Sequence, residues 1–159
     1  MEAVMLIGIQ ASGKTTFYQQ RFFATHVRIS LDLLGTRERE SAVLDTCLRI
    51  QQRFVIDNTN VTAAERARYI LPSRAAKFRV IGYFFKPDRK AAFARNLSRT
   101  ERERIPAAGF FGTLKRLEPP KRSEGFDHLY RVWILRPGEF GIEAWDAPSR
   151  AMDIAHRLP

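Results

Sequence analysis

Residues 8–15 read GIQASGKT, which fits the pattern G-x-x-x-x-G-K-[ST] of a phosphate-binding loop. An apolar run over residues 3–9 precedes this motif, and a helical stretch expected over about residues 13–23 follows it. A strand before the loop and a helix after it form the setting in which the motif binds phosphate. The motif therefore predicts binding of a nucleoside triphosphate, with ATP and Mg²⁺ as the expected cofactors, but it does not define the reaction.

Each position of this loop has an expected role in holding phosphate. Gly8 and Gly13 are expected to adopt backbone angles that turn N–H groups toward phosphate oxygens. Lys14 is expected to reach the β and γ phosphates, and the Thr15 hydroxyl is expected to bind Mg²⁺. The expected nucleotide contacts in the loop are Gly8, Gln10, Ala11, Ser12, Gly13, Lys14, Thr15 and Thr16.

Apolar, β-branched runs alternate with helical stretches along the chain. The expected strands cover residues 3–9, 27–29, 54–56, 78–85 and 129–135. The expected helices cover about residues 13–23, 37–52, 62–75, 87–101 and 106–117. Strands that alternate with helices are typical of a parallel sheet covered by helices on both faces. We therefore predict a single-domain, three-layer α/β P-loop NTPase fold with about five mainly parallel strands.

The composition is that of a soluble globular domain with a basic surface. Of 159 residues, 45% are hydrophobic and 28% are charged, and 27 Lys and Arg against 17 Asp and Glu give a net charge of +10. The longest apolar run is far shorter than the roughly 20 residues of a membrane helix. Since the one cysteine, Cys47, cannot form an internal disulfide, we expect a cytoplasmic protein. The charge favours nucleic acid and nucleotide phosphates as ligands, although many soluble proteins are merely basic.

Two aspartates follow expected strands. Asp32 comes after residues 27–29, and Asp57 comes directly after residues 54–56. Because the carboxyl ends of parallel strands meet at one edge of the sheet, both should lie near the phosphate loop. We assign Asp57 to Mg²⁺ because it ends an apolar run, and Asp32 as the general base that accepts a proton from an attacking hydroxyl. The alternatives are a helix cap for Asp32 and a turn-forming residue for Asp57.

Basic residues recur from Lys86 to Arg104, in and just after the expected helix over about residues 87–101. Arg95, Arg99 and Arg102 follow the spacing i, i+4 and i+7, which places them on one face of a helix. Arginines that close over a triphosphate stabilise the charge of phosphoryl transfer and exclude water. We therefore interpret this region as a lid, with a solvent-exposed charged face as the alternative.

Together these motifs resemble the 5′-polynucleotide kinase family over about residues 4–134. The resemblance rests on the phosphate loop and on RISLDLLG (28–35), FVIDNTNVTAAERARYI (54–70), ARNLSR (94–99), IP (105–106) and EPPKRSEGF (118–126). It implies an adenylate-kinase-like fold with strand order 2-3-1-4-5 and an arginine-bearing helical lid over about residues 87–117. The kinase domain would cover residues 1–136. Residues 137–159 would form a C-terminal extension packed on the same domain, with a short helix over residues 147–157.

The resemblance also implies roles for individual residues. Lys14 and Thr15 resemble the family's contacts to ATP and Mg²⁺, and Asp32 resembles the general base that activates a 5′-hydroxyl group. Arg99 resembles the lid arginine on the β and γ phosphates, and Arg95 resembles its neighbour near the nucleotide. The expected catalytic residues are therefore Lys14, Asp32 and Arg99.

Gly35 departs from part of the family. The phage member has an arginine at this position that helps to hold the phosphate of the acceptor, whereas the animal member shares the sequence Asp-x-Leu-Gly found here. Arg37 and Arg39, beside the loop of the expected base, are candidates for contacts to the acceptor. Lys121 and Arg122 are further candidates.

We therefore predict a kinase that transfers the γ-phosphate of ATP to a hydroxyl group, with the 5′-hydroxyl ends of DNA or RNA as the expected partner. No membrane and no obligate protein partner are expected. One alternative is a kinase of the same fold that acts on a sugar acid or a nucleoside. The other is an ATP-binding switch module that does not catalyse transfer. The family's phosphatase motif Asp-x-Asp does not occur in the sequence, so 3′-phosphatase activity is not expected.

Overall fold

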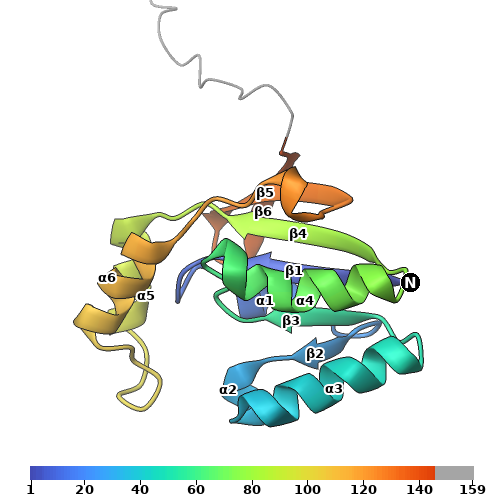
Figure 1. Cartoon of the computed structure of the whole chain (residues 1–159). Helices are drawn as coiled ribbons and strands as arrows, with labels where there is room; N and C mark the ends of the chain where they lie inside the picture. The colour runs from blue at the N-terminus through green and yellow to red at the C-terminus, as the bar shows by residue number, and fades with distance from the viewer. Residues whose placement is uncertain (146–159) are drawn as a thin grey trace, which may run out of the picture.

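The computed structural model describes residues 1–145 and contains one six-stranded sheet in the order β2-β3-β1-β4-β5-β6 (Figure 1). The strands are β1 Glu2–Ile7, β2 Val27–Ile29, β3 Phe54–Asp57, β4 Arg79–Phe85, β5 His128–Arg136 and β6 Glu139–Ala144. The first five strands are parallel, and β6 pairs with β5 in the antiparallel direction. The predicted fold class and the strand order 2-3-1-4-5 are confirmed.

The sixth strand was not predicted. It is short, and a glycine, Gly141, stands at its centre. In the structure a Cβ atom at Gly141 would collide with the indole of Trp133 on β5, so this glycine allows two neighbouring strands to pair beneath a large ring. The pairing of β6 incorporates residues 139–144 of the expected C-terminal extension into the sheet. The helix expected over residues 147–157 lies outside the described residues.

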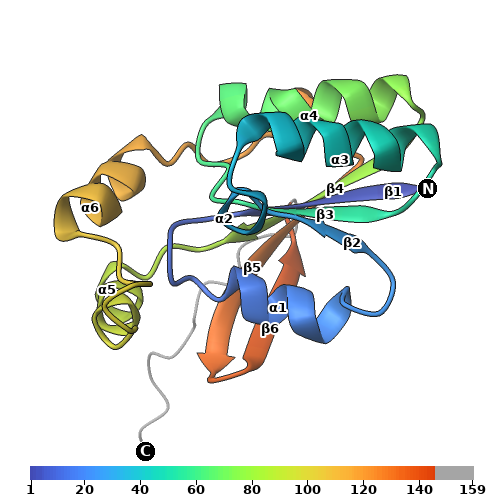
Figure 2. The ribbon, with the colours of Figure 1, turned by 90° about the horizontal axis from the view of Figure 1, so that it is seen from below.

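The helices lie in two layers, with a pair beyond the sheet. They are α1 Lys14–Arg21, α2 Leu31–Leu34, α3 Arg37–Arg49, α4 Ala63–Ala75, α5 Arg89–Leu97, α6 Ala107–Arg116 and the 3-10 helix η1 Arg122–Glu124. Figure 2 shows α3 and α4 on one face of the sheet and α1 on the other, with α5 and α6 beyond the carboxyl ends of the strands. None of the helices in residues 1–145 is long and apolar enough to cross a membrane.

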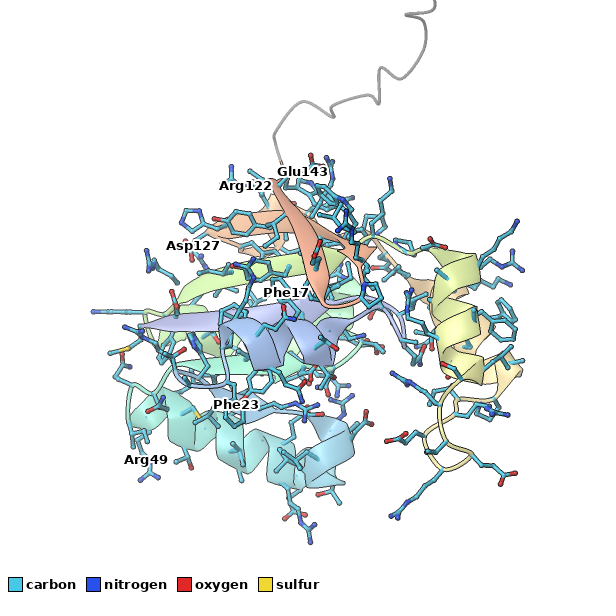
Figure 3. All side chains as sticks on the ribbon, turned by 180° about the vertical axis from the view of Figure 1, so that it is seen from behind. Phe17, Phe23, Arg49, Arg122, Asp127 and Glu143 are labelled. Carbon is cyan, nitrogen blue, oxygen red and sulfur yellow. The ribbon has the colours of Figure 1, made fainter. Side chains whose placement is uncertain are left out.

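The central strand β1 shows why the sheet needs a helical layer on each face. Its side chains alternate between the faces, as the pleat of a strand requires. Met5 packs in a cluster with Leu44 of α3 and Ile70 of α4, whereas Leu6 packs in a second cluster with Phe17 of α1 (Figure 3). A strand that is apolar on both faces has no face to turn toward water, and this accounts for the unbroken hydrophobic run in the sequence.

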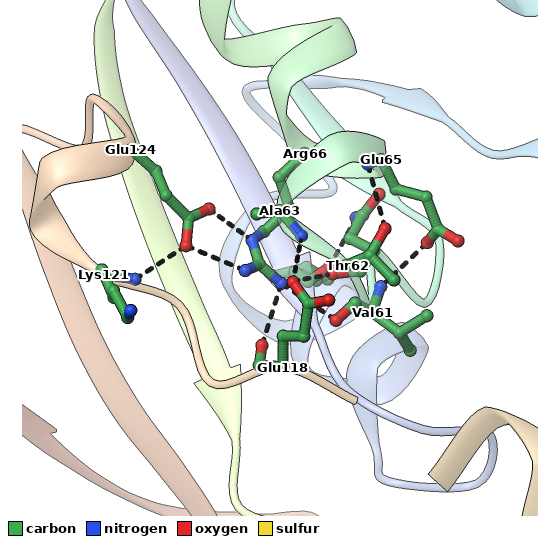
Figure 4. Close-up of polar contacts among 10 residues, drawn as sticks. Val61, Thr62, Ala63, Glu65, Arg66, Glu118, Lys121 and Glu124 are labelled. Atoms are coloured by element: carbon green, nitrogen blue, oxygen red, sulfur yellow. Dashed lines mark hydrogen bonds and ion pairs between the residues drawn. The ribbon is translucent and has the colours of Figure 1, made fainter. Parts of the chain in front are cut away.

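A buried arginine joins α4 to the segment that precedes β5 (Figure 4). Arg66 is fully buried and donates to both carboxylate oxygens of Glu124, at 2.6 and 2.8 Å. It also donates to the backbone carbonyl of Glu118, whose carboxylate accepts the N–H of Ala63 at the start of α4. The segment over residues 118–126, a family motif in the sequence, therefore holds the first turns of α4 in place.

Candidate active site

The phosphate loop joins β1 to α1 at the carboxyl edge of the sheet. Gly13 has φ +94°, and a Cβ there would lie 3.0 Å from the ring of Phe140 on β6, so glycine is required on both counts. Gly8 has no positive φ, but its Cβ would lie 2.9 Å from the Cβ of Phe85 on β4. The prediction of special backbone angles is thus right for Gly13 and wrong for Gly8, which is needed for close approach to the neighbouring strand.

The side chain of Lys14 is folded into this loop. Its ammonium group donates to the carbonyl oxygens of Gly8 at 3.0 Å and Ile9 at 2.7 Å, and to the hydroxyl of Ser12 at 3.4 Å. Burial lowers the pKa of Lys14 to about 8, with the charge of Asp57 acting in the opposite direction. A buried ammonium held only by neutral groups is well suited to a ligand that brings negative charge.

Thr15 and Asp57 meet as the sequence predicts. The Thr15 hydroxyl donates to Oδ2 of Asp57 at 3.1 Å, and the Asp57 side chain is only 2% exposed. A hydroxyl and a carboxylate are oxygen ligands of the kind that Mg²⁺ prefers, so these residues fit the expected ion. No group of three His, Cys, Asp or Glu side chains that could form a complete cage occurs within residues 1–145. Nucleotide phosphates and water would therefore supply the remaining ligands.

An arginine that the sequence analysis did not single out lies at the same carboxylate. Arg28 of β2 places Nε and Nη2 at 2.9 and 2.8 Å from Oδ2 of Asp57, and its guanidinium lies over the ring of Tyr18. The only signal in the sequence is an arginine in the middle of a short apolar strand. Its partner could be found only once β2 and β3 were known to be neighbours.

Asp32 lies in the first turn of α2, and its side chain is exposed. The position that caps this helix belongs to Ser30, and within residues 1–145 the Asp32 carboxylate accepts no hydrogen bond. The alternative of a helix cap is therefore wrong. Burial has the largest effect on the pKa of Lys14, and the charges of Asp57, Arg99 and Asp32 also act on it. Asp57, Arg99 and Asp32 therefore lie within electrostatic reach of the phosphate loop.

The helix that carries the lid arginines is shorter than predicted. α5 ends at Leu97, so Arg99 and Arg102 lie in the loop between α5 and α6, and the expectation of three arginines on one helical face is wrong. The cause is Asn96, a buried residue that donates to the carbonyl of Ile105 at 2.7 Å and accepts its N–H at 3.0 Å. These two hydrogen bonds hold the end of α5 against the start of the segment before α6, so the chain leaves the helix after Leu97.

The phosphate loop and the lid are in direct contact. Nε of Arg95 donates to the carbonyl of Ala11 at 2.7 Å, and the amide of Gln10 donates to Thr113 of α6 at 3.0 Å. Ile9 is fully buried in a cluster with Ala92 of α5 and Phe110 of α6. The structure thus brings Arg95 onto the loop as expected and directs Gln10 toward the lid. Ala11 and Ser12 are buried, whereas Thr15 and Thr16, in the first turn of α1, are exposed.

The four basic candidates for acceptor contacts are divided between two places. Arg37 and Arg39 lie at the start of α3, next to α2, and Nη1 of Arg39 reaches the carbonyl of Leu34 at 3.4 Å. Lys121 and Arg122 lie at η1 before β5, toward the opposite edge of the sheet from β2, and Arg122, labelled in Figure 3, donates to the carbonyl of Asp127. The structure therefore brings only the first two close to Asp32.

Comparisons with known proteins agree with this fold. The sequence model of a family described as AAA domain matches residues 31–120, more than half of the chain. The bifunctional polynucleotide phosphatase/kinase of Schizosaccharomyces pombe is 24% identical over 135 residues, which cover 82% of this chain. The match covers 33% of that relative, so the chain spans a third of its length.

Two solved structures have the same architecture. Kti12 of Chaetomium thermophilum, in complex with ADP-AlF3, has a TM-score of 0.63 and 16% identity over 82% of this chain and 88% of its own. A gluconokinase from Sinorhizobium meliloti 1021 has a TM-score of 0.62 and 15% identity over 86% of this chain and 85% of its own. At such identities these structures establish the fold alone, which is the mostly parallel α/β fold of P-loop kinases.

Proposed function

The chain belongs to the AAA domain family, and from this membership we propose that it is an ATP-dependent kinase that phosphorylates a hydroxyl group. The phosphate loop supplies Lys14, whose buried ammonium would exchange backbone carbonyls for phosphate oxygens. Arg95 and Arg99 add positive charge from the lid side of the same loop. Preorganised positive charge around the transferring phosphoryl group is the main means by which such enzymes lower the activation barrier of phosphoryl transfer.

The reaction requires an acceptor for one proton, and Asp32 is the residue that we assign to this role. The hydroxyl oxygen of the acceptor attacks the γ-phosphorus, its proton passes to the Asp32 carboxylate, and the bond from the γ-phosphorus to the β–γ bridging oxygen breaks to release ADP. Mg²⁺ held beside Thr15 and Asp57 would neutralise charge on the phosphate oxygens. The absence of a competing hydrogen bond on Asp32 within residues 1–145 leaves its carboxylate free for this proton.

We further propose that the acceptor is the 5′-hydroxyl end of a nucleic acid. The observation that carries this proposal is the position of Arg39. Its Nη1 lies 4.0 Å from the point that a Cβ of Gly35 would occupy, so Arg39 brings a guanidinium from α3 to the neighbourhood of the residue at which the phage member of the resembling family has its arginine. An exposed carboxylate with an exposed guanidinium beside it suits a hydroxyl that is followed by a phosphate. The name of the Schizosaccharomyces pombe relative supports the same class of acceptor.

The test is an acceptor panel with γ-labelled ATP. It contains DNA and RNA oligonucleotides with a 5′-hydroxyl, the same oligonucleotides with a 5′-phosphate, a mononucleoside and gluconate. We expect label on the 5′-hydroxyl oligonucleotides and none on the 5′-phosphorylated controls. Preferred labelling of gluconate or of the nucleoside would replace the proposal by a small-molecule kinase. Binding of ATP without transfer to any acceptor would indicate a switch module.

A further inference from the structure

A buried acid outside the proposed chemistry lies next to α2. Glu40 of α3 is 3% exposed, and a carboxylate in such a place is costly unless its oxygens are fully hydrogen-bonded. Oε2 accepts from Arg37 at 2.7 Å, and Oε1 accepts from the Asn58 amide at 2.6 Å and from the Tyr69 hydroxyl at 3.0 Å. Three donors from three different elements therefore converge on one side chain.

These contacts lead to the helix that carries Asp32. The side-chain oxygen of Asn58 accepts the N–H of Leu31, the first residue of α2, at 2.8 Å. Because a carboxylate can only accept, Glu40 requires the NH₂ group of Asn58 to face it, and this leaves the amide oxygen facing Leu31. Glu40 thus determines which end of the Asn58 amide meets α2.

The other two partners keep this arrangement in one protonation state. Burial and the charge of Glu40 raise the pKa of Tyr69 to about 12, so its hydroxyl remains a donor. Burial opposes the charge of Arg37, but its hydrogen bonds to Glu40 and Tyr69 and their charges together outweigh burial and raise the pKa of Arg37. Arg37 also donates to the Tyr69 oxygen at 2.8 Å. The direction of each hydrogen bond in the network is therefore fixed: Glu40 accepts, Arg37 donates, and the Tyr69 hydroxyl donates to Glu40 while it accepts from Arg37.

α2 depends on such bonds because little of it is packed, although the partly buried Leu34 contacts the main core cluster. The helix has four residues, none of them buried, and Leu33 is 64% exposed. A single turn of helix has little stability of its own. The hydrogen bond from Leu31 to Asn58 is consequently a principal restraint on the orientation of α2, and Asn58 follows directly on Asp57 at the end of β3.

We infer that Glu40 is a positioning residue that acts through Asn58 and the Leu31 N–H to hold Asp32 beside the phosphate loop. This inference rests on the proposed function for the role of Asp32. The placement of α2 by Glu40 can be tested without any acceptor.

The first measurement is amide hydrogen exchange in the Glu40→Gln variant of the whole chain. The NH₂ group of glutamine must face either Asn58 and Tyr69 or Arg37, all of which donate to Glu40 in the wild type. In both orientations the network loses an acceptor. We expect exchange at Leu31 to become at least about tenfold faster, since loss of a hydrogen bond to a charged group weakens the local structure by roughly that factor. Glu38→Gln, which removes an equal charge from an exposed position of the same helix, should leave this exchange unchanged. Unaltered protection of Leu31 in Glu40→Gln would overturn the inference.

The second measurement separates positioning from general stability. Glu40→Gln should lower kcat by about 10- to 100-fold, the cost of misplacing a catalytic group by about an ångström, with an unchanged KM for ATP. In an Asp32→Asn background the same substitution should cause no further loss, because it acts through Asp32. An equal fold-loss in both backgrounds would overturn the inference.

Two further outcomes remain decisive. Should Glu40→Gln fail to fold, Tyr69→Phe removes one donor only and should give a smaller loss of the same pattern. Unchanged Leu31 exchange and unchanged kcat in that variant would count against the inference. A wild-type protein that labels no acceptor would refute the proposed function, and the exchange experiment would still decide whether Glu40 holds α2.

Discussion

Oδ2 of Asp57 lies 2.8 Å from Nη2 of Arg28, and the same oxygen accepts the hydroxyl proton of Thr15. The residue expected to serve the metal is therefore already neutralised by a positive charge. A divalent ion that approaches Asp57 must compete with this guanidinium or share the carboxylate with it. Arg28 also packs over Tyr18, so it has a second contact that could retain it near the site.

Replacement of Arg28 by methionine tests this competition. The variant should have a lower Tm without ligand, because the buried Asp57 carboxylate loses its cationic partner. Its Tm gain on addition of Mg²⁺ and ATP should exceed that of the wild type, and half-saturation should require less Mg²⁺. The measurement is a thermal melt over a Mg²⁺ series at constant ATP. An equal gain for both proteins would show that Arg28 does not compete with the ion.

Binding of ATP should weaken at alkaline pH. Since burial lowers the pKa of free Lys14 to about 8 and a bound triphosphate favours the charged form, binding requires uptake of a proton above that pH. Affinity should be constant below about pH 7 and fall by up to about tenfold per pH unit well above 8. Calorimetric titration across this range provides the measurement. Lys14→Arg, which stays charged, should not show the fall even if it binds more weakly, and a flat profile in the wild type would contradict the assignment.

Asp32→Asn should preserve ATP affinity and reduce turnover by roughly 10²- to 10⁴-fold, the usual effect of losing a general base. Asparagine keeps the shape of the side chain but cannot accept the proton. Asp45→Asn, an exposed position on α3, is the matched control and should retain full turnover. Reduced ATP affinity together with normal turnover would mean that Asp32 serves the nucleotide or the metal instead.

The buried ion pair of Figure 4 should contribute far more to stability than an exposed pair. Glu124→Ala leaves the fully buried Arg66 without its carboxylate, which should lower the free energy of unfolding by about 3 to 5 kcal/mol. Arg79→Ala, which removes the exposed partner of Glu2, should cost less than about 1 kcal/mol. Urea unfolding of both variants compares the two effects. Similar losses would mean that Arg66 finds other acceptors when Glu124 is absent.

Turnover of an oligonucleotide acceptor should fall steeply with salt. Each neutralised phosphate contributes a slope of roughly −0.7 to −0.9 in log affinity against log salt between about 50 and 200 mM. Arg39→Ala should reduce the slope by about the share of one phosphate. Arg49→Ala, at the far end of α3 (Figure 3), should leave it unchanged. A mononucleoside should show little salt dependence, and an equal response for both acceptors would favour a small-molecule kinase.

The phosphate loop and its pairing with Asp57 were predictable, because the motif and the ends of buried strands are local patterns that the fold brings together in one way. The partners Arg28, Glu40 and Tyr69 were not. Their contacts join residues far apart in the chain, and which side of a helix faces which strand is decided by packing.

Tertiary contacts also explain two of the differences between the expected and the observed secondary structure. The helical pattern continues past Leu97, but the tertiary contact of Asn96 with Ile105 overrides it. β6 is held in the sheet by its pairing with β5, where Gly141 lies under Trp133, whereas its own sequence is too short and too polar to indicate a strand.

The contacts of Ile9 and Gln10 with the lid have a consequence for protein engineering. A phosphate loop is often regarded as a segment that can be exchanged between proteins. In this chain, however, two of its variable positions, Ile9 and Gln10, contact α5 and α6. A chimera that receives residues 8–15 from another protein with this fold would retain every motif residue and still lose the apolar contact of Ile9 with Phe110. Transfer of the phosphate loop between proteins therefore requires transfer of α5 and α6 with it.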